Sequence, residues 1–430
     1  MTRRLAIAPL ALFLVAAGPA PSPEALRKDV EALVRFGTRH TLSSVTDPKR
    51  GIGAARRWAS ARLQKMSKAC GGCITVDLPS KRFDGPRAPQ GVDLVNVMGI
   101  QKGSDGSSDV VIVAGHIDSR VTDVMDATSD APGANDDASG VALVLESARI
   151  LSQTKPRATI IYAILSGEEQ GLWGGRLLAE TAKARGWNVL AMLNNDIVGN
   201  TVGQDGRVVA DKVRVFSEGI RSSEGEAAQR ARRGNGGEDD GPSRALAKAI
   251  GKIAGQTRGS LTPFLVRRPD RFGRGGDHTP MLEAGFPAVR FTVGVENYDA
   301  QHQDVRTESG RAYGDTVERM DFAYLAKVTA LNIAVMNTLA NAPPPPTQVV
   351  ALGAVSTSTT INWTAAPGAV VYKLYWRAAD ASDWQNERTL GNVTTAEIPG
   401  LIIDDHFVGV SSVGVDGSES IVSFAGAAPR

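Results

Sequence analysis

The chain has 430 residues, of which 42% are hydrophobic and 22% are charged, and its formal net charge is +2. This length is too great for one ordinary domain and predicts two or three. The near-neutral charge gives no support for a nucleic-acid-binding protein or for one that adheres to an anionic membrane.

The amino terminus has the pattern of a secretory signal. Arg3 and Arg4 precede an apolar segment, residues 5–17, which is followed by the small residues Gly18-Pro19-Ala20. A positive start, a short apolar middle and a small-residue end are typical of a cleaved signal peptide. We predict a signal peptide at residues 1–20 and an exported protein, periplasmic or secreted. We expect no membrane insertion, because no comparable apolar stretch follows.

The only two cysteines lie close together, in the sequence Cys70-Gly71-Gly72-Cys73. In the oxidising compartment that a secretory signal implies, a small disulfide loop is the favoured interpretation. A redox-active pair stays open as an alternative, whereas a zinc site made of cysteines would need a second pair.

Hydrophobic periodicity predicts alternating helices and strands over residues 21–342. Strands are expected at residues 93–100, 110–114, 159–165, 189–193 and 288–293, and helices at residues 23–36, 52–67, 141–151, 172–184, 246–253 and 322–339. This alternation is typical of an α/β fold, a mainly parallel sheet sandwiched by helices. In such sheets the functional crevice lies at the carboxyl ends of the strands.

The composition changes at a predicted proline-rich linker, residues 343–347. Residues 348–430 contain short runs rich in Val, Thr and Ser between turns, which predicts an antiparallel β-sandwich. This segment resembles a fibronectin type III domain, with His406 near the place of that fold's corner tyrosine. Residues 21–342 then form a separate domain. Within it, the charged and glycine-rich residues 218–243 are expected to form a surface excursion.

Two adjacent carboxylates, Glu168 and Glu169, follow directly on the buried strand predicted at residues 159–165. Neighbouring side chains diverge, so one glutamate can bind a metal ion while the other holds or takes a proton. Taken alone, such a stretch is more often a solvated turn, so the interpretation depends on the other residues at strand ends.

Other residues that can bind metals lie at the ends of predicted strands or in the loops beside them. They are, in chain order, His116, Asp118, Asp136, Asp196 and His302. Two histidines and three carboxylates suffice for two zinc ions that share one carboxylate. Asp118, two residues after His116, is placed to orient that imidazole.

The remaining histidines are weaker candidates. His40 is expected to be structural, and His406 belongs to the sandwich. His278, beside Asp277, either lines the site or is a buried, hydrogen-bonded side chain.

The motifs resemble, in order, those of the dizinc aminopeptidase family, which includes bacterial leucyl-type aminopeptidases and glutamate carboxypeptidase relatives. The matching stretches are His116-Ile117-Asp118, residues 133–140, Glu168-Glu169-Gln170-Gly171, Asn195-Asp196 and His302. Each motif is weak alone, but the ordered set is specific and covers residues 25–340.

The resemblance implies a ligand set for two Zn²⁺ ions. His116 and Asp196 would bind one ion, and Glu169 and His302 would bind the other. Asp136 would bridge the two ions.

The resemblance also implies catalytic roles. Glu168 would be the general base, Asp118 would support the site, and the peptide bond after Asp136 would be cis. Several relatives have a tyrosine directly before the last histidine, where it stabilises the oxyanion. Here that residue is Gln301, and Tyr298 lies three positions earlier.

By this resemblance the protein is an exported dizinc aminopeptidase, which removes the residue at the free amino end of a peptide substrate. Zinc-bound hydroxide would attack the scissile carbonyl, and Glu168 would move the proton to the leaving amine.

Three alternatives stay open. A carboxypeptidase or dipeptidase on the same scaffold would differ in pocket loops such as residues 218–243 and 271–278. A glutaminyl-cyclase-like enzyme would have one zinc ion, against which the five predicted ligands argue. A non-catalytic binding module would have lost ligands that this chain keeps. The sequence identifies no partner for the C-terminal domain.

Overall fold

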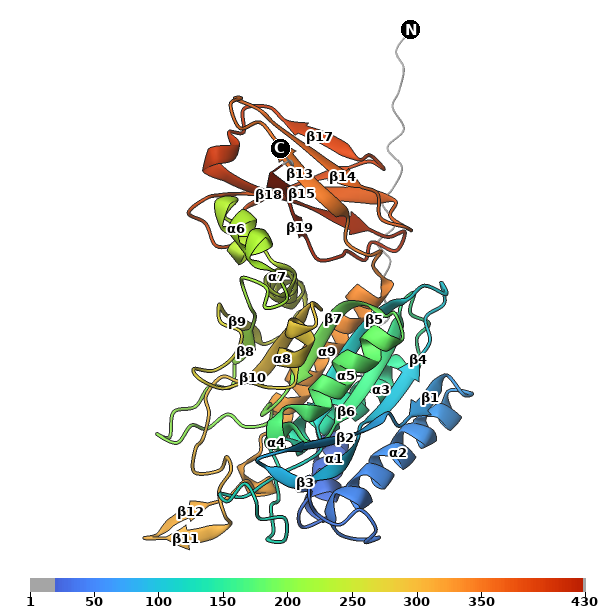
Figure 1. The fold of residues 1–430 in the computed structure, drawn as a ribbon, viewed down its shortest axis with the longest axis vertical. Coiled ribbons are helices and arrows are strands. Elements are labelled where there is room, and N and C mark those ends of the chain that lie inside the picture. The colour runs from blue at the N-terminus through green and yellow to red at the C-terminus, as the bar shows by residue number, and fades with distance from the viewer. Residues whose placement is uncertain (1–19, 428–430) are drawn as a thin grey trace.

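The computed structural model describes residues 20–427, which form an α/β part and, at one end of it, a β-sandwich (Figure 1). The predicted signal peptide lies outside the described residues except for Ala20, so it stays a prediction. The two parts meet next to the proline-rich segment, and the division into domains at residues 343–347 stays a prediction.

An eight-stranded sheet forms the centre of the α/β part. Its strands lie in the spatial order β1 (Ile74–Asp77), β4 (Val97–Gln101), β6 (Thr159–Leu165), β5 (Asp109–His116), β7 (Asn188–Asn195), β10 (Ala288–Val293), β8 (Lys212–Phe216) and β9 (Thr262–Val266). The four central strands β6, β5, β7 and β10 are parallel. The pairs β1–β4, β4–β6 and β10–β8 are antiparallel. The predicted mainly parallel sheet is confirmed, with antiparallel additions towards both edges.

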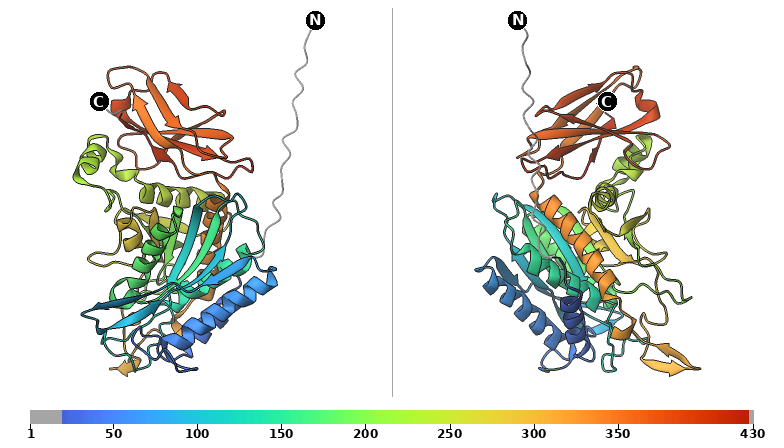
Figure 2. Two further views of the ribbon diagram at one scale, coloured as in Figure 1. Left: turned by 45° about the vertical axis from the view of Figure 1, so that its right-hand side comes forward. Right: turned by 180° about the vertical axis from the view of Figure 1, so that it is seen from behind.

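Helices cover both faces of this sheet (Figure 2). One face carries α1 (Pro23–Val34), α2 (Gly51–Ala69), α3 (Ala138–Leu151), α7 (Pro242–Gln256) and α9 (Phe322–Asn341), and the other carries α5 (Trp173–Ala184) and α8 (His278–Glu283). In β5, Val111 and Val113 belong to the first core, whereas Val110 and Ile112 belong to the second. Both faces of the strand are therefore buried, which explains its uninterrupted apolar sequence.

The strand predicted at residues 93–100 is in fact two strands, separated at Asn96. β3 (Ala88–Val95) forms a hairpin with β2 (Ser80–Gly85), and β4 joins the main sheet. The buried Asn96 carboxamide donates to Gly174 O (2.9 Å) and accepts from Ser166 N (3.1 Å). At this point hydrogen bonds of the Asn96 side chain take the place of backbone pairing between strands. The apolar run is therefore divided into two strands.

Short elements complete the α/β part. They are α4 (Glu168–Gly171), α6 (Glu226–Gly234), the hairpin of β11 (Arg306–Glu308) and β12 (Arg311–Tyr313), and 3₁₀ turns at Gly237–Asp239 and Val317–Arg319. Helix α6 has no buried residue, as expected for a surface excursion. The predicted disulfide between Cys70 and Cys73 is present.

The C-terminal region consists of two four-stranded sheets. One contains β17 (Thr395–Ile398), β14 (Thr359–Thr364), β13 (Thr347–Leu352) and β20 (Gly426–Ala427), and the other contains β16 (Asn386–Leu390), β15 (Val371–Ala378), β18 (His406–Val413) and β19 (Ser423–Phe424). A 3₁₀ turn, Ile403–Asp405, precedes His406, whose ring Nδ1 lies 2.9 Å from Ile402 O. The predicted sandwich is present, and its likeness to fibronectin type III stays a prediction.

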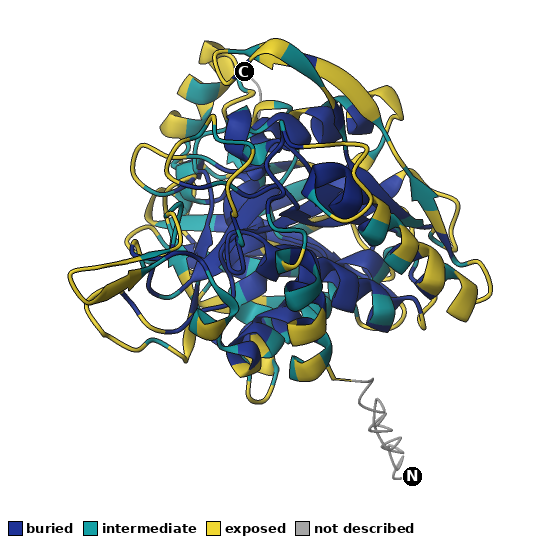
Figure 3. Ribbon diagram, turned by 90° about the horizontal axis from the view of Figure 1, so that it is seen from below, coloured by how far each residue is buried: buried dark blue, intermediate teal, exposed yellow. Residues whose placement is uncertain are grey.

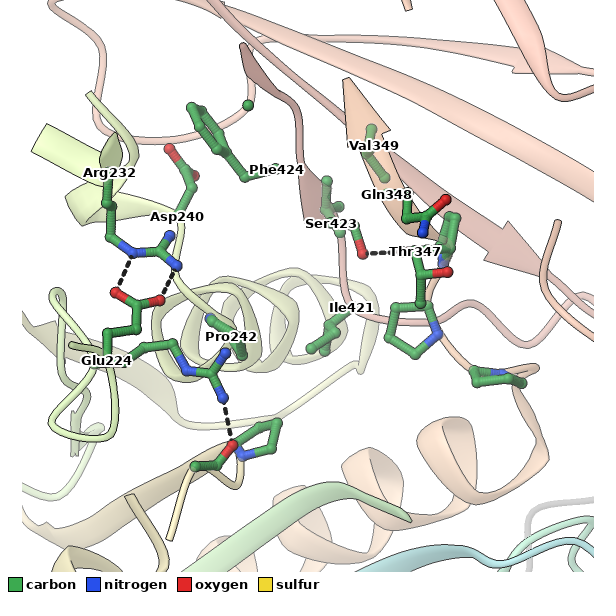
Figure 4. Close-up of a pocket in the computed structure, with 18 of the residues that line it drawn as sticks. Glu224, Arg232, Asp240, Pro242, Thr347, Gln348, Val349, Ile421, Ser423 and Phe424 are labelled. Carbon is green, nitrogen blue, oxygen red and sulfur yellow. Dashed lines mark hydrogen bonds and ion pairs between the residues drawn. The ribbon is translucent and has the colours of Figure 1, made fainter. Parts of the chain in front are cut away.

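The sandwich docks at the amino ends of the parallel strands. Arg377 pairs with Asp240 (2.5 Å), and both side chains are 2% exposed. Lys252 of α7 donates to Tyr375 and Glu419 of the sandwich. Beside these contacts lies a cavity of about 810 Å³ between the start of β7, the prolines and β19 (Figure 4).

Helix α9 is the one described helix whose length and mean hydropathy of 1.3 would allow it to cross a membrane. The sequence predicted a helix at residues 322–339 but no membrane span there. In the structure, 61% of the most apolar 18-residue segment of this helix is buried against the rest of the protein, as in the core helix of a globular domain.

Candidate metal centre

The five predicted ligands come together at the carboxyl ends of the parallel strands, at the opposite end of the sheet from the sandwich. His116 ends β5, Asp196 follows β7, Glu169 lies in α4, Asp136 lies in the loop before α3, and His302 lies in the loop after β10. Seen from this end, buried segments fill the centre and exposed loops surround them (Figure 3).

The ligands form two clusters that share Asp136, and each cluster has its ligand atoms within 4.8 Å of one another. In the first, His116 Nε2 lies 3.2 Å from Asp136 Oδ1 and 3.9 Å from Asp196 Oδ1. In the second, His302 Nε2 lies 3.0 Å from Asp136 Oδ2 and 3.1 Å from Glu169 Oε1. Each cluster offers one imidazole nitrogen and two carboxylates, a donor set that suits zinc.

Two buried atoms that point into these clusters have no hydrogen-bond partner. They are His116 Nε2 in the first cluster and Glu169 Oε1 in the second. A buried polar atom without a partner costs stability, so such atoms are rare unless something else binds them. Each cluster thus has one buried ligand atom without a hydrogen-bond partner, as expected if each cluster binds a metal ion.

The charges in the clusters also fit cations. Burial alone would lower the pKa of His302, but Glu169 and Asp136 raise it to about 10. Burial would likewise lower the pKa of His116, but Asp118, Asp136 and Asp196 raise it well above its usual range. The carboxylates therefore favour positive charge at both imidazoles, and a bound cation would meet the same preference.

Asp118 connects the first histidine to the glutamate pair. Its backbone oxygen lies 3.1 Å from His116 Nδ1, so the other ring nitrogen, Nε2, is free to face the cluster. Its carboxylate accepts from the backbone N–H groups of Glu168 (3.3 Å) and Glu169 (3.1 Å) and from Thr41 Oγ1 (2.9 Å). Asp118 is thus a positioning residue, fully buried beneath the site.

A network of hydrogen bonds fixes the loop that carries Asp136. Asp315 accepts from the backbone N–H of Asp136 (2.7 Å), and Asp137 accepts from Gly140 N (2.8 Å) and His116 N (3.0 Å). The peptide bond between Asp136 and Asp137 is cis, as the resemblance implied. A Cβ on Gly140 would lie 2.2 Å from Asn195 O, so only glycine permits this close approach of α3 to β7.

Glu168 begins α4 directly after a left-handed Gly167 (φ 72°), whose Cβ position would meet Leu94 Cδ1 at 2.5 Å. Among the described residues, no side chain pairs with its carboxylate, which lines the pocket over the two clusters. Burial, together with the carboxylates of Asp196 and Glu169, raises the pKa of Glu168 well above its usual range. A partner-free carboxylate with a raised pKa is suited to take up a proton.

Several residues at the site were not foreseen. Arg290, fully buried in β10, donates to Asp196 Oδ1 (2.9 Å). Arg120 contacts two of the three ligands of the second cluster, with Nε 2.9 Å from Glu169 Oε2 and Nη2 2.6 Å from His302 Nδ1. Asp315 holds the loop described above. Only Arg120 lies next to a recognised motif, so only it had a signal in the sequence.

The Arg120 contact affects the protonation of His302. A guanidinium can only donate, so Nδ1 must accept, because a proton there would place two donors 2.6 Å apart. This contact therefore opposes the imidazolium that the carboxylates favour. A neutral imidazole that binds a metal ion through Nε2 carries its proton on Nδ1, so Arg120 Nη2 would have to move away from that atom.

Other candidates lie outside the clusters. His278 is buried, with Nε2 2.8 Å from Pro269 O, and His40 is buried, with Nε2 2.9 Å from Val124 O. Both are structural. Residues 218–243 lie beside the sandwich, so their expected part in the pocket was wrong, whereas Arg271 and Arg274 of the loop at residues 271–278 do line it. Gln301 also lines the pocket.

The sequence was compared with known proteins. The profile of "Peptidase family M28" matches residues 96–335. A "probable zinc metalloprotease" of Leptosphaeria maculans is 42% identical over 395 residues, 91% of each chain. The chain belongs to peptidase family M28. A second relative, a "probable zinc metalloprotease" of Pyricularia oryzae, is 42% identical over 414 residues, 93% of this chain and 81% of that one. The protein is a zinc metallopeptidase that acts on peptides.

Solved structures share the M28 fold. LapB of Legionella pneumophila has a TM-score of 0.55 and 15% identity, over 74% of this chain and 71% of its own. A leucine aminopeptidase precursor of Bacteroides thetaiotaomicron has a TM-score of 0.52 and 16% identity, over 75% and 99%. Glutaminyl cyclase of Porphyromonas gingivalis has a TM-score of 0.51 and 18% identity, over 74% and 99%. At such identities the likeness shows the fold alone.

Proposed function

We propose that this M28 peptidase is an exported dizinc aminopeptidase. The observation that carries the two-metal proposal is the pair of clusters that share Asp136, each with a buried atom that lacks a partner. His116 and Asp196 would hold one ion, Glu169 and His302 the other, and Asp136 both. The five ligands favour this function over a one-zinc cyclase.

The side chains suit hydrolysis of a peptide bond. Two zinc ions, when bound, would polarise the scissile carbonyl and make the attacking water more acidic. Glu168 takes a proton from that water as the water oxygen bonds to the carbonyl carbon. It then gives the proton to the leaving amine as the C–N bond breaks. Asp118 holds the Glu168 N–H and His116, so base and ligand keep a fixed relation.

Aminopeptidase activity is the finer part of the proposal. It is supported by the ordered motifs and by the fold shared with a leucine aminopeptidase precursor. Export is supported by the amino-terminal sequence.

The test combines metal analysis with a choice of substrates. We expect purified protein to bind two zinc equivalents, to lose activity with a chelator, and to cleave peptides with a free amine in preference to acetylated ones. Cleavage of only the acetylated set would overturn the aminopeptidase assignment. Full activity with one tightly bound zinc would overturn the dizinc assignment.

A further inference from the structure

Arginines line the pocket over the metal centre. This pocket, of about 500 Å³, includes the metal ligands and Glu168, and its wall also contains Arg87, Arg120, Arg271 and Arg274. Apart from the ligands and Glu168, none of the described residues that line it is acidic. The wall therefore carries positive charge that could act on a substrate.

Two of these arginines are used by the protein itself. Arg120 is held by Glu169 and His302, as described above. Arg271 is 9% exposed and pairs with Asp270 (3.1 Å). Neither guanidinium is free to bind a ligand.

Arg274 is underpaired. Among the described residues its only carboxylate partner is Glu296 (3.4 Å), which already pairs with Arg214 (2.6 Å) and Arg271 (3.5 Å). Three guanidinium groups thus share one carboxylate, and the Arg274 side chain is one-third exposed at the pocket.

Gln301 helps to hold Arg274 at the wall. Its amide oxygen accepts from Arg274 Nη2 (2.7 Å) when its nitrogen donates to Glu296 Oε2 (3.2 Å). The opposite orientation makes only longer contacts, from its nitrogen to Asp136 Oδ2 (3.4 Å) and to its oxygen from Arg274 Nη1 (3.3 Å), so we prefer the first.

Arg87 reaches the pocket from the turn between β2 and β3. It donates to the backbone oxygen of Glu169 (2.7 Å), and among the described residues no carboxylate lies within ion-pair distance of it. With metals bound, the ligand carboxylates would not neutralise these arginines, because two divalent ions carry more charge than three ligand carboxylates.

We infer that Arg274 and Arg87 form a subsite for a carboxylate of the substrate. This inference rests on the proposed peptidase function and specifies its substrate class. Guanidinium groups bind carboxylates through charge-assisted hydrogen bonds. That carboxylate has two sources in a peptide: an aspartate or glutamate side chain, or the C-terminal carboxylate of a short peptide.

Matched peptides separate the two sources. The side-chain arm compares Ala-Glu-Ala-amide with Ala-Gln-Ala-amide, and Glu-Ala-Ala-amide with Gln-Ala-Ala-amide. The C-terminal arm compares Ala-Ala-Ala with its amide. In at least one arm we expect kcat/KM for the acid to exceed that for the isosteric amide by about 10–100-fold, as for a hydrogen bond to a charged group. Equal values in every arm would overturn the inference while leaving the peptidase function intact.

Variants assign the preference to the named residues. Arg274→Gln and Arg87→Gln should each lower the ratio of acid to amide kcat/KM, and raised salt should lower it in the wild type. Arg82→Gln is the control, because Arg82 lies on the same hairpin but pairs with Asp93 outside the pocket. An unchanged preference in both folded pocket variants would overturn the assignment.

A binding measurement keeps the inference testable if no peptide is cleaved. Zinc-loaded protein is titrated by calorimetry with glutamic acid α-amide and glutamine α-amide, and with alanine and alaninamide. We expect tighter binding of the acid in the pair that matches the preferred source, and loss of that difference in Arg274→Gln. No difference in either pair would overturn the subsite, whereas absence of cleavage alone would count only against the proposed function.

Discussion

The buried charged groups at the two ends of the central sheet differ in how completely they are paired. At the amino ends, where the sandwich docks, Asp240 meets both Arg377 and Lys248, and Glu419 meets Lys252 and Lys373. At the carboxyl ends, three ligand carboxylates and Glu168 gather, and buried atoms of His116 and Glu169 lack partners.

This difference separates structural from functional charge. A buried ion is tolerated when it is paired, so the charges at the docking surface need nothing more from outside the chain. At the other end, Arg290 and Arg120 each reach a ligand carboxylate, yet buried atoms of the ligands stay without a partner, which marks a place where the protein is built to bind cations. A substitution at the carboxyl ends should therefore change turnover or zinc binding, whereas one at the amino ends should change stability.

The largest effect is expected for Glu168→Gln. The amide cannot take the proton from the attacking water, so we expect kcat to fall by about 10²–10⁴-fold with both zinc ions retained. Glu169→Gln should instead lower the metal content. Glu180→Gln, an exposed residue paired with Lys81, is the control. Steady-state kinetics and metal analysis decide, and near-normal turnover of the first variant would refute the general-base role.

At the other end, Arg377→Met should affect stability and leave catalysis alone. Breaking a buried ion pair costs about 3–5 kcal/mol, and we expect the lower end because Asp240 keeps Lys248 (2.6 Å). Denaturant unfolding measures the loss, with the exposed Arg230→Met as control. A fall in kcat/KM of the folded variant would show that the two ends are coupled.

Asp118→Asn tests positioning without removal of a ligand. Loss of such a supporting carboxylate typically lowers metal affinity by about 10–100-fold. The weakening should appear in competition with a chelator, which reports binding independently of turnover. Unchanged zinc affinity would mean that the backbone contact alone orients His116.

The smallest effect is expected for Thr41→Val, which removes one donor to Asp118 while conserving shape. We expect a loss of about 1 kcal/mol in folding free energy and a modest loss of zinc affinity. Thermal unfolding with and without zinc separates the two. A loss as large as that of Asp118→Asn would show that this hydroxyl dominates the network.

The ligands could be predicted because each lies at a strand end or in an adjoining loop within a local motif. Asp118 could be predicted because it lies two residues from His116, but the distant supports could not: Arg290 and Asp196 are 94 residues apart, and Asp315 and Asp136 are 179 apart. Such contacts depend on topology, which sequence periodicity does not report.

Topology also explains the misplaced loop at residues 218–243. It follows β8, which runs antiparallel to β10, so it emerges at the sandwich end of the sheet. β8 and β9 were not predicted, because they are short, and β9 contains Pro263 and lies at the sheet edge.

The placement of β20 has a practical consequence. This last described strand pairs with β13 in the sandwich, which lies at the opposite end of the molecule from α4 (Figure 1). A protein attached to a bead or sensor chip through its C-terminus would present the pocket over the metal centre to the liquid and turn the sandwich towards the support. Immobilised enzyme should then process a peptide stream as readily as free enzyme does.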